Sequence, residues 1–325
     1  MSDATATIVE TRPTLSVIIP NFNHAHFLPA CLDSVLNQSW QPEEVIVIDD
    51  ASTDNSVEVI EGFMRKYPLV RLHRNPENRG ILYNINLARE LAHGDYLYHP
   101  AADDTVMPGF FETSMQLLAR HPQAALSCTV GIWTEESSGY QWQMGLGNGS
   151  EPCYLTPDQM FELERNGRLY IAAHTVIFRR VCLAEAGGFI PELKWYTDWF
   201  AAYVAGFRHG VCFVPEPLAR FNILPASYYT RSRAEPRGNR EVLEHLLELL
   251  NRPEYREPSD RIARSGAMYQ LGPGLLGVIR SRSEYGRFWT TPLLRKYLWH
   301  RFRLFGKRLL PKWVGRLYLM AFYKN

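Results

Sequence analysis

Residues 15–54 read LSVIIPNFNHAHFLPACLDSVLNQSWQPEEVIVIDDASTD, and this stretch decides the fold. Two largely apolar runs, Leu15–Pro20 and Val45–Asp49, are short and rich in β-branched residues, as buried strands are. The segment between them, His26–Asn37, has the apolar spacing of a helix. A strand, a helix and a second strand in this order predict a βαβ unit with parallel strands.

The same alternation continues to about residue 110. Strands are predicted at Val70–Arg74 and Asp95–His99, and helices at Asp54–Lys66 and Gly80–Ala92. The fold class is therefore α/β, with a mostly parallel central sheet flanked by helices. In such sheets ligands bind beyond the carboxyl ends of the strands, so the site is expected there.

The remainder of the chain is predicted to add a few strands and then only helices. Residues 132–152, rich in Gly, Ser and Trp, are interpreted as a loop. The predicted organisation is a tail (1–13), a catalytic domain (14–225, with halves 14–110 and 111–225) and a helical extension (226–325). The other elements expected are helices at 107–120, 158–165 and 241–250, a helix through Asp198, and strands at 124–130, 175–179 and 211–214.

Composition excludes several classes of protein. With 325 residues, 46% of them hydrophobic and 21% charged, the chain can bury a large core, which rules out disordered, collagen-like and coiled-coil proteins. Five scattered cysteines without CxxC spacing predict free thiols in a reducing compartment. The first residues do not read as a secretory signal, and no apolar run reaches the roughly 18 residues of a spanning helix. We expect a cytoplasmic protein.

The net charge of +1 conceals two opposite parts. Residues 285–325 contain ten Lys and Arg and no acid, which leaves 25 basic and 34 acidic residues in the rest of the chain. A basic segment interleaved with Trp, Phe, Tyr and Leu is typical of a helix on anionic lipid, so residues 287–325 predict peripheral attachment to the inner face of the cell membrane. Docking on the acidic body or on another subunit is the alternative, and the acidic body disfavours nucleic acid as a partner.

Polar residues follow three of the predicted strands. They are Pro20 to Asn23 after the first strand, Asp49 and Asp50 after the second, and Asp103 and Asp104 after the fourth. Two adjacent carboxylates repel one another when buried, and Mg²⁺ or Mn²⁺ would offset that repulsion by binding both them and a substrate phosphate. The alternative is that both are solvated loop acids.

Three blocks of the sequence, within residues 14–205, resemble the inverting glycosyltransferases of family 2, which have the GT-A fold. The first is the stretch quoted above, and the others are NPENRGILYNINLARELAHGDYLYHPAADD (75–104) and GGFIPELKWYTDWF (187–200). The resemblance implies a nucleotide-diphospho-sugar donor, UDP- or dTDP-linked, a divalent metal, and transfer to a glycan or glycolipid hydroxyl. Bacterial cell-surface polysaccharide assembly is the expected process.

The resemblance also implies roles for residues. The metal is expected at Asp104 and Asp103, although Ala101 stands where the family has a further acid, which weakens the expected metal dependence. Asp50 would bind the base or ribose. The full set of nucleotide-binding residues expected is Pro20, Asn21, Phe22, Asn23, Asp49, Asp50, Arg79, Gly80 and Asp103.

Asp198 matches the family's catalytic base, with Thr197 before it where the family often has Glu. His174 is expected either to contact donor or acceptor or to be a core histidine, and Trp195 and Tyr196 either to stack on a sugar or to be packing residues. A non-catalytic sugar-nucleotide-binding scaffold is the alternative function, which Ala101 favours and Asp198 disfavours.

Overall fold

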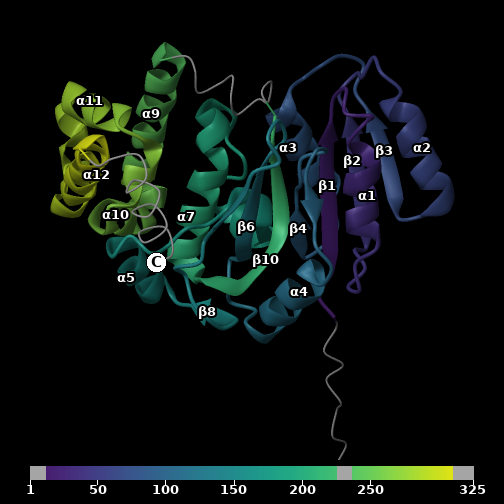
Figure 1. The fold of residues 1–325 in the computed structure, drawn as a ribbon, viewed down its shortest axis with the longest axis horizontal. Helices are drawn as coiled ribbons and strands as arrows, with labels where there is room; N and C mark the ends of the chain where they lie inside the picture. The colour runs from purple at the N-terminus through teal and green to yellow at the C-terminus, as the bar shows by residue number, and fades with distance from the viewer. Residues whose placement is uncertain (1–11, 225–235, 310–325) are drawn as a thin grey trace, which may run out of the picture.

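The computed structural model describes residues 12–224 and 236–309. Within these residues ten strands form one sheet, in the order β3-β2-β1-β4-β9-β6-β10-β5, with β7 paired to β6 and β8 to β10 (Figure 1). The strands are β1 (Leu15–Asn21), β2 (Glu44–Asp49), β3 (Val70–Arg74), β4 (Tyr96–Tyr98), β5 (Thr105–Val106), β6 (Leu126–Glu135), β7 (Gln141–Met144), β8 (Cys153–Leu155), β9 (Ile177–Arg179) and β10 (Val211–Ile223).

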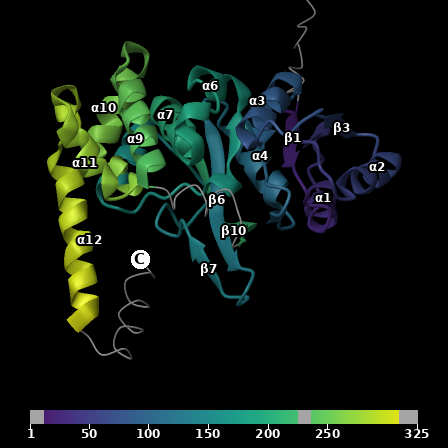
Figure 2. The same ribbon diagram turned by 90° about the horizontal axis from the view of Figure 1, so that it is seen from above.

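Helices cover both faces of the sheet (Figure 2). The side chains of α3, α6 and α7 share one buried apolar cluster, and those of α1, α2 and α4 share a second one on the other face. The helices are α1 (Leu28–Leu36), α2 (Ser56–Lys66), α3 (Ile81–Leu91), α4 (Phe110–Arg120), α5 (Pro157–Arg165), α6 (Arg180–Glu185), α7 (Thr197–His209), α9 (Pro236–Asn251), α10 (Arg256–Ser265), α11 (Gly274–Ser281) and α12 (Thr291–Leu309), with short 3-10 turns η1 (Ala173–Thr175), η2 (Pro191–Tyr196), η3 (Pro253–Tyr255), η4 (Ala267–Leu271) and η5 (Ser283–Phe288).

The parallel half of the sheet confirms the predicted strands and helices of residues 15–99. β1 pairs with β2 and β4, and β2 with β3, all in parallel. Both faces of β1 are buried, since Ile18 faces the first cluster and Val17 the second. The continuous apolar runs follow from this two-sided burial, which is worth roughly 1.5–3 kcal/mol for each large side chain.

The prediction of a loop over residues 132–152 is wrong in part. β6 continues to Glu135 and turns through residues 136–140 into β7, so that Trp133 lies opposite Trp142. β10 likewise runs to Ile223 rather than Val214, because its irregularities near Pro217 are absorbed as changes of register without ending the strand. The sequence pattern could not identify these parts of β6, β7 and β10, because they are polar and contain no apolar run.

The C-terminal helices pack directly on the α/β body. Side chains of α9, α10, α11 and α12 belong to the same buried cluster as α7, so this region has no separate core of its own. The predicted division between residues 225 and 226 lies outside the described residues. In the part of the chain that the structure covers, no helix combines the length and apolarity needed to cross a bilayer.

Candidate active site

The carboxyl ends of β1, β2 and β4 meet at one edge of the sheet, and Asp50 lies directly after β2. The backbone N–H groups of Arg79 and Gly80 each donate to its carboxylate at 2.8 Å, and Asn75 donates a third hydrogen bond at 2.7 Å. Asn75 is held in turn by Asn84 on α3. Burial raises the pKa of Asp50, but these hydrogen bonds outweigh it and bring the pKa below its usual value. The Asn84 side chain also lowers the pKa of Asp50 as a hydrogen-bond donor, so the acceptor positions of this carboxylate are largely satisfied within the protein.

The turns after β1 and β2 are tied to each other. Asn21 donates to Asp49 at 2.9 Å, and the Ser52 hydroxyl accepts the backbone N–H of Asn23 at 2.9 Å. Both turns contain a non-glycine residue in the left-handed region, Asn23 at φ 56° and Ala51 at φ 60°. Strain of this kind is often found where a backbone is shaped for a ligand. Within the described residues the buried Asn21 Oδ1 has no hydrogen-bond partner, so an acceptor remains available there.

A cavity of about 430 Å³ opens beside these turns, at the ends of β2 and β3. The cavity is shallow and largely open to solvent. Its lining combines backbone, hydroxyl, amide and guanidinium groups, which suits a nucleobase and ribose. The lining residues are Ala51, Ser52, Arg74, Asn75 and Pro76.

The predicted nucleotide residues on the rim differ in exposure. Pro20 is buried within β1, whereas the Phe22 ring is 43% exposed. Arg79 lies 4.7 Å from the ring of Tyr83, which is also exposed. Gly80 has φ 86°, and a Cβ built there would meet no atom of the described residues within 4 Å, its two chain neighbours aside. The space in front of Gly80 is therefore open to a ligand.

Asp103 and Asp104 lie in the turn between β4 and β5. Asp104 is 3% exposed, and its Oδ1 accepts the backbone N–H of Asn222 from β10 at 3.0 Å. Burial raises the pKa of both carboxyls, and the charge of Asp103 raises the pKa of Asp104 further. Among the described residues neither acid forms an ion pair, and the nearby His24 lowers the pKa of Asp103 by less than burial raises it.

This acid pair fits a divalent cation. Two carboxylates are the oxygen ligands that Mg²⁺ and Mn²⁺ take, and the cation would remove the repulsion between them. In the described part of the chain no third His, Cys, Asp or Glu lies close enough to complete a protein cage. The position of the absent acid is occupied by Ala101. Phosphate oxygens of a substrate would have to supply further ligands.

Asp198 lies in the first turn of α7, at the same edge of the sheet. Its side chain is 38% exposed, so a substrate can reach the carboxylate. The helix dipole favours a negative charge in this position. Lys194, four residues earlier, has φ 45° and ψ −120°, a strained conformation that turns the chain sharply into α7. Thr197, in the position where the family often has Glu, is 1% exposed.

The three aromatic candidates occupy different environments. His174 is buried between Trp133 and Phe221, with ring centroids 4.7 and 5.5 Å away, and burial lowers its pKa to about 3. Tyr196 is 6% exposed and donates its hydroxyl to the carbonyl of Leu271 at 2.7 Å, so it anchors the C-terminal helices. Trp195 is half-buried, and its indole N–H lacks a partner within the described residues.

Three residues of this edge were absent from the sequence-based set. Asn75 comes directly after a predicted strand, and that position alone could have identified it. His99 is the last residue of the predicted strand Asp95–His99, and only the direction of its side chain brings it to Asp198. Asn222 could not have been found, because it lies within a strand and is 118 residues from Asp104.

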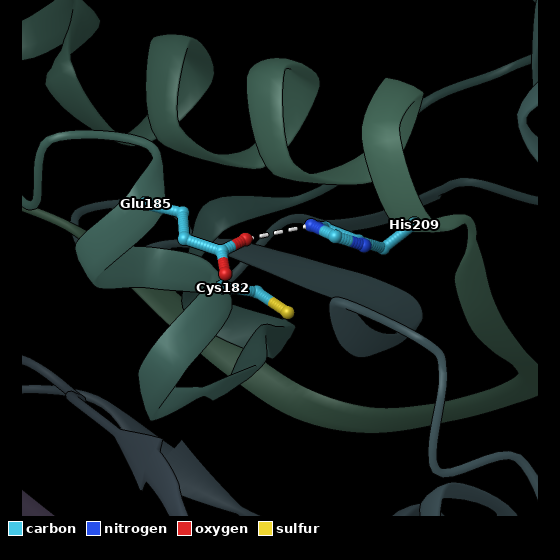
Figure 3. Close-up of side chains that lie close together, drawn as sticks. All are labelled: Cys182, Glu185 and His209. Atoms are coloured by element: carbon cyan, nitrogen blue, oxygen red, sulfur yellow. Dashed lines mark hydrogen bonds and ion pairs between the residues drawn. The ribbon is translucent and has the colours of Figure 1, made fainter.

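A second cluster, Cys182, Glu185 and His209, lies at the opposite edge of the sheet (Figure 3). His209 Nε2 and Glu185 Oε2 are 2.8 Å apart, and Arg208 donates to the Glu185 carbonyl. Burial raises the pKa of the Cys182 thiol. The contact between Glu185 and His209 links α6 to the end of α7, and a protonated thiol is a poor ligand for a metal.

Comparisons with known proteins agree with this arrangement. Residues 16–183, more than half of the chain, match the family model for glycosyl transferase family 2. YibD of Escherichia coli (strain K12), an uncharacterised glycosyltransferase, is 36% identical over 129 residues, 40% of this chain and 37% of its own length. Chondroitin synthase of Pasteurella multocida (strain Pm70) is 36% identical over 135 residues, 40% of this chain and 14% of its own length.

Two solved structures share the fold. TarS 1–349 from S. aureus, in complex with UDP-GlcNAc, has a TM-score of 0.61 and 17% identity over 83% of this chain and 73% of its own. The mannosyltransferase PcManGT from Pyrobaculum calidifontis, in complex with GDP-Man and Mn²⁺, has a TM-score of 0.52 and 16% identity over 91% and 82%. The fold is GT-A, and the chain belongs to glycosyl transferase family 2.

Proposed function

We propose that this protein is an inverting glycosyltransferase that transfers a sugar from a UDP- or dTDP-sugar to a glycan or glycolipid hydroxyl, in bacterial cell-surface polysaccharide assembly. The observation that carries the proposal is the convergence of three features on one sheet edge. They are the cavity beside Asp50, the acid pair Asp103 and Asp104, and the accessible carboxylate of Asp198. The relation to chondroitin synthase and to structures with bound nucleotide-sugars supports the substrate class.

The chemistry follows from these positions. Asp198 takes the proton of the acceptor hydroxyl, whose oxygen forms a bond to the sugar C1 while the bond from C1 to the diphosphate oxygen breaks on the opposite face. A divalent cation held by Asp103 and Asp104 would stabilise the negative charge of the departing diphosphate. One carboxylate base suffices for this single displacement, which inverts the configuration at C1.

Nucleotide titration tests the donor site. We expect UDP or dTDP to bind more tightly than GDP, with Mn²⁺ increasing the affinity. Asp50→Asn should weaken binding by about 10- to 150-fold, since a hydrogen bond to a charged group is worth about 1.5–3 kcal/mol. Asp104→Asn should abolish the effect of Mn²⁺. Calorimetric titration measures both.

The matched control is Asp158→Asn, because Asp158 is an exposed acid on α5, far from the cavity. It should bind nucleotide like the wild type. Binding that is unchanged in Asp50→Asn would contradict the donor assignment. Selective binding together with no turnover on any UDP- or dTDP-sugar would favour the scaffold function.

We further propose that α12 attaches the enzyme to an anionic membrane surface. Only the exposed part of this helix, from Leu298 onward, would contact the lipid. Arg287 and Lys296, at the start of the basic segment, are paired with Asp260 and Glu164 of the body. Beyond them α12 projects from the body (Figure 2) and exposes three large apolar side chains. Those side chains are Leu298 (68%), Trp299 (54%) and Phe302 (64%).

Vesicle sedimentation tests this attachment. The protein should bind phosphatidylserine-containing vesicles more strongly than pure phosphatidylcholine. Replacing Trp299 and Phe302 together by Ala should lower the partition coefficient by about tenfold or more, because each buried aromatic contributes roughly 1.5–3 kcal/mol. Replacing two exposed apolar residues elsewhere, Met64 and Val181, by Ala is the control and should leave binding unchanged. Equal loss in both pairs would contradict the role of α12.

A further inference from the structure

His99 is the residue directly after β4, in the middle of the sheet. Tyr98 before it packs its ring against Phe110 and Phe111 of α4, on one face of the sheet. Successive side chains of an extended chain point to opposite faces, so His99 points to the face covered by α7. Two rings on that face contact it, Phe189 at 4.5 Å and Phe178 at 5.8 Å between centroids.

The imidazole is held in one orientation. The His99 side chain is 7% exposed. The neighbouring Phe189 is held in place, because Asn86 of α3 donates a 2.7 Å hydrogen bond to its backbone carbonyl. This fixed ring directs Nε2 toward Asp198, with 3.7 Å between Nε2 and Oδ1. Catalytic hydrogen bonds are often this long before substrate binds, and they shorten in the complex.

We propose that His99 is a positioning residue for the base. Its Nε2–H donates to Asp198 Oδ1 and so keeps Oδ2 directed at the acceptor hydroxyl. This inference rests on the proposed role of Asp198 as the base. A carboxylate can only accept, so the contact requires the proton of a neutral His99 ring to be on Nε2.

The surroundings explain why a histidine serves here. A neutral N–H orients a carboxylate without adding a full positive charge, which would make the carboxylate a poorer base. Of the elements around the pair, β9 and the turn before η2 contribute the uncharged rings of Phe178 and Phe189. The charged side chains on these and the other elements include Arg179 of β9, Glu192 and Lys194 of η2, Arg89 and Glu90 of α3, and Asp103 and Asp104 after β4.

Kinetics of two substitutions test the proposal, with the UDP- or dTDP-sugar that the donor panel selects. His99→Leu removes the hydrogen-bond donor of the imidazole, whereas His99→Gln places an amide N–H near the position of Nε2. We expect His99→Leu to lower kcat by about 10- to 100-fold, with the KM for the sugar nucleotide nearly unchanged. His99→Gln should retain most of the wild-type kcat. In His99→Leu the acid limb of the kcat–pH profile should move to higher pH, since a carboxylate without its hydrogen bond is protonated more readily.

Phe178→Leu is the packing control. This substitution loosens the packing around His99 but keeps the His99 N–H. It should therefore lower the stability of the protein and leave the acid limb of the kcat–pH profile in place. The proposal is overturned if Leu and Gln behave alike, or if Phe178→Leu moves the acid limb as far as His99→Leu does.

Two further measurements separate this inference from the assignment of the base. In an Asp198→Asn background, His99→Leu should have no additional effect on kcat, and a full additional loss would overturn the role of His99 alone. If Asp198→Asn itself leaves transfer intact, the base assignment fails instead. Independently of activity, nitrogen-15 NMR at alkaline pH should show the proton of His99 on Nε2, and a proton on Nδ1 would overturn the proposal.

Discussion

Replacing Asp198 with Asn should lower kcat for sugar transfer by about 10²- to 10⁴-fold, the usual contribution of a general base. The amide keeps the size of the side chain and its place at the start of α7, but it cannot take the acceptor proton. Affinity for the nucleotide should stay within about twofold of the wild type, because the nucleotide residues lie on other elements. Initial rates with saturating donor, together with calorimetric titration of the nucleotide, measure the two quantities.

The same substitution also removes a negative charge from a helix N-terminus. That loss is worth about 0.3–1 kcal/mol of stability, too little to unfold the protein at the assay temperature. Asp54→Asn provides a comparison, since Asp54 lies just before α2 and accepts the backbone N–H groups of Ala25 and Ser56. If the two variants lose activity equally, Asp198 has a structural role and the base must be sought elsewhere.

The sequence predicted β1 and β2 because these two strands are buried on both faces. Such strands are unbroken runs of Val, Ile and Leu, as in β1 and β2. β7 and the outer part of β10 escaped prediction because partner strands hold them in place and their own composition does not require them there. Trp142 is in a strand because it lies opposite Trp133, which no local pattern records.

The site could be predicted as far as it depends on strand ends. Asp50, Asp103 and Asp104 follow strands, and parallel strands bring their carboxyl ends to one edge. What was missed depends on side-chain direction or on distant pairing. Asn222 reaches Asp104 from β10, and His99 reaches Asp198 only because the alternation of β4 turns it toward α7.

The basic tail shows a further limit of charge counting. The sequence allows two alternatives for the tail, binding to lipid or docking on the acidic body. Each alternative applies to the whole segment, because charge counting does not divide it. In the structure its start is docked, and the exposed large apolar side chains among its described residues, Leu298, Trp299 and Phe302, all lie beyond Tyr297. The docking depends on a buried ion pair, which composition cannot identify.

Lys296→Met should destabilise the protein by about 3–5 kcal/mol, because it leaves a buried carboxylate without its cation. Glu164 is 2% exposed, and Lys296 Nζ lies 2.6 Å from its Oε1. Tyr203 of α7 and Gln270 donate to the other oxygen, at 2.8 and 3.1 Å, so α5, α7 and α12 meet at this one carboxylate. Denaturant unfolding followed by tryptophan fluorescence measures the loss.

The matched control is Arg282→Met, which breaks an exposed pair with Glu248 and should cost much less stability, because solvent screens exposed ion pairs. The double substitution Lys296→Met with Glu164→Gln should recover much of the loss, since no unpaired charge is then buried. Recovery would show that the pair is needed for charge balance more than for attraction. If Lys296→Met costs no more than Arg282→Met, α12 is held by its apolar contacts alone, and the start of the basic tail is free to follow its exposed end onto a lipid surface.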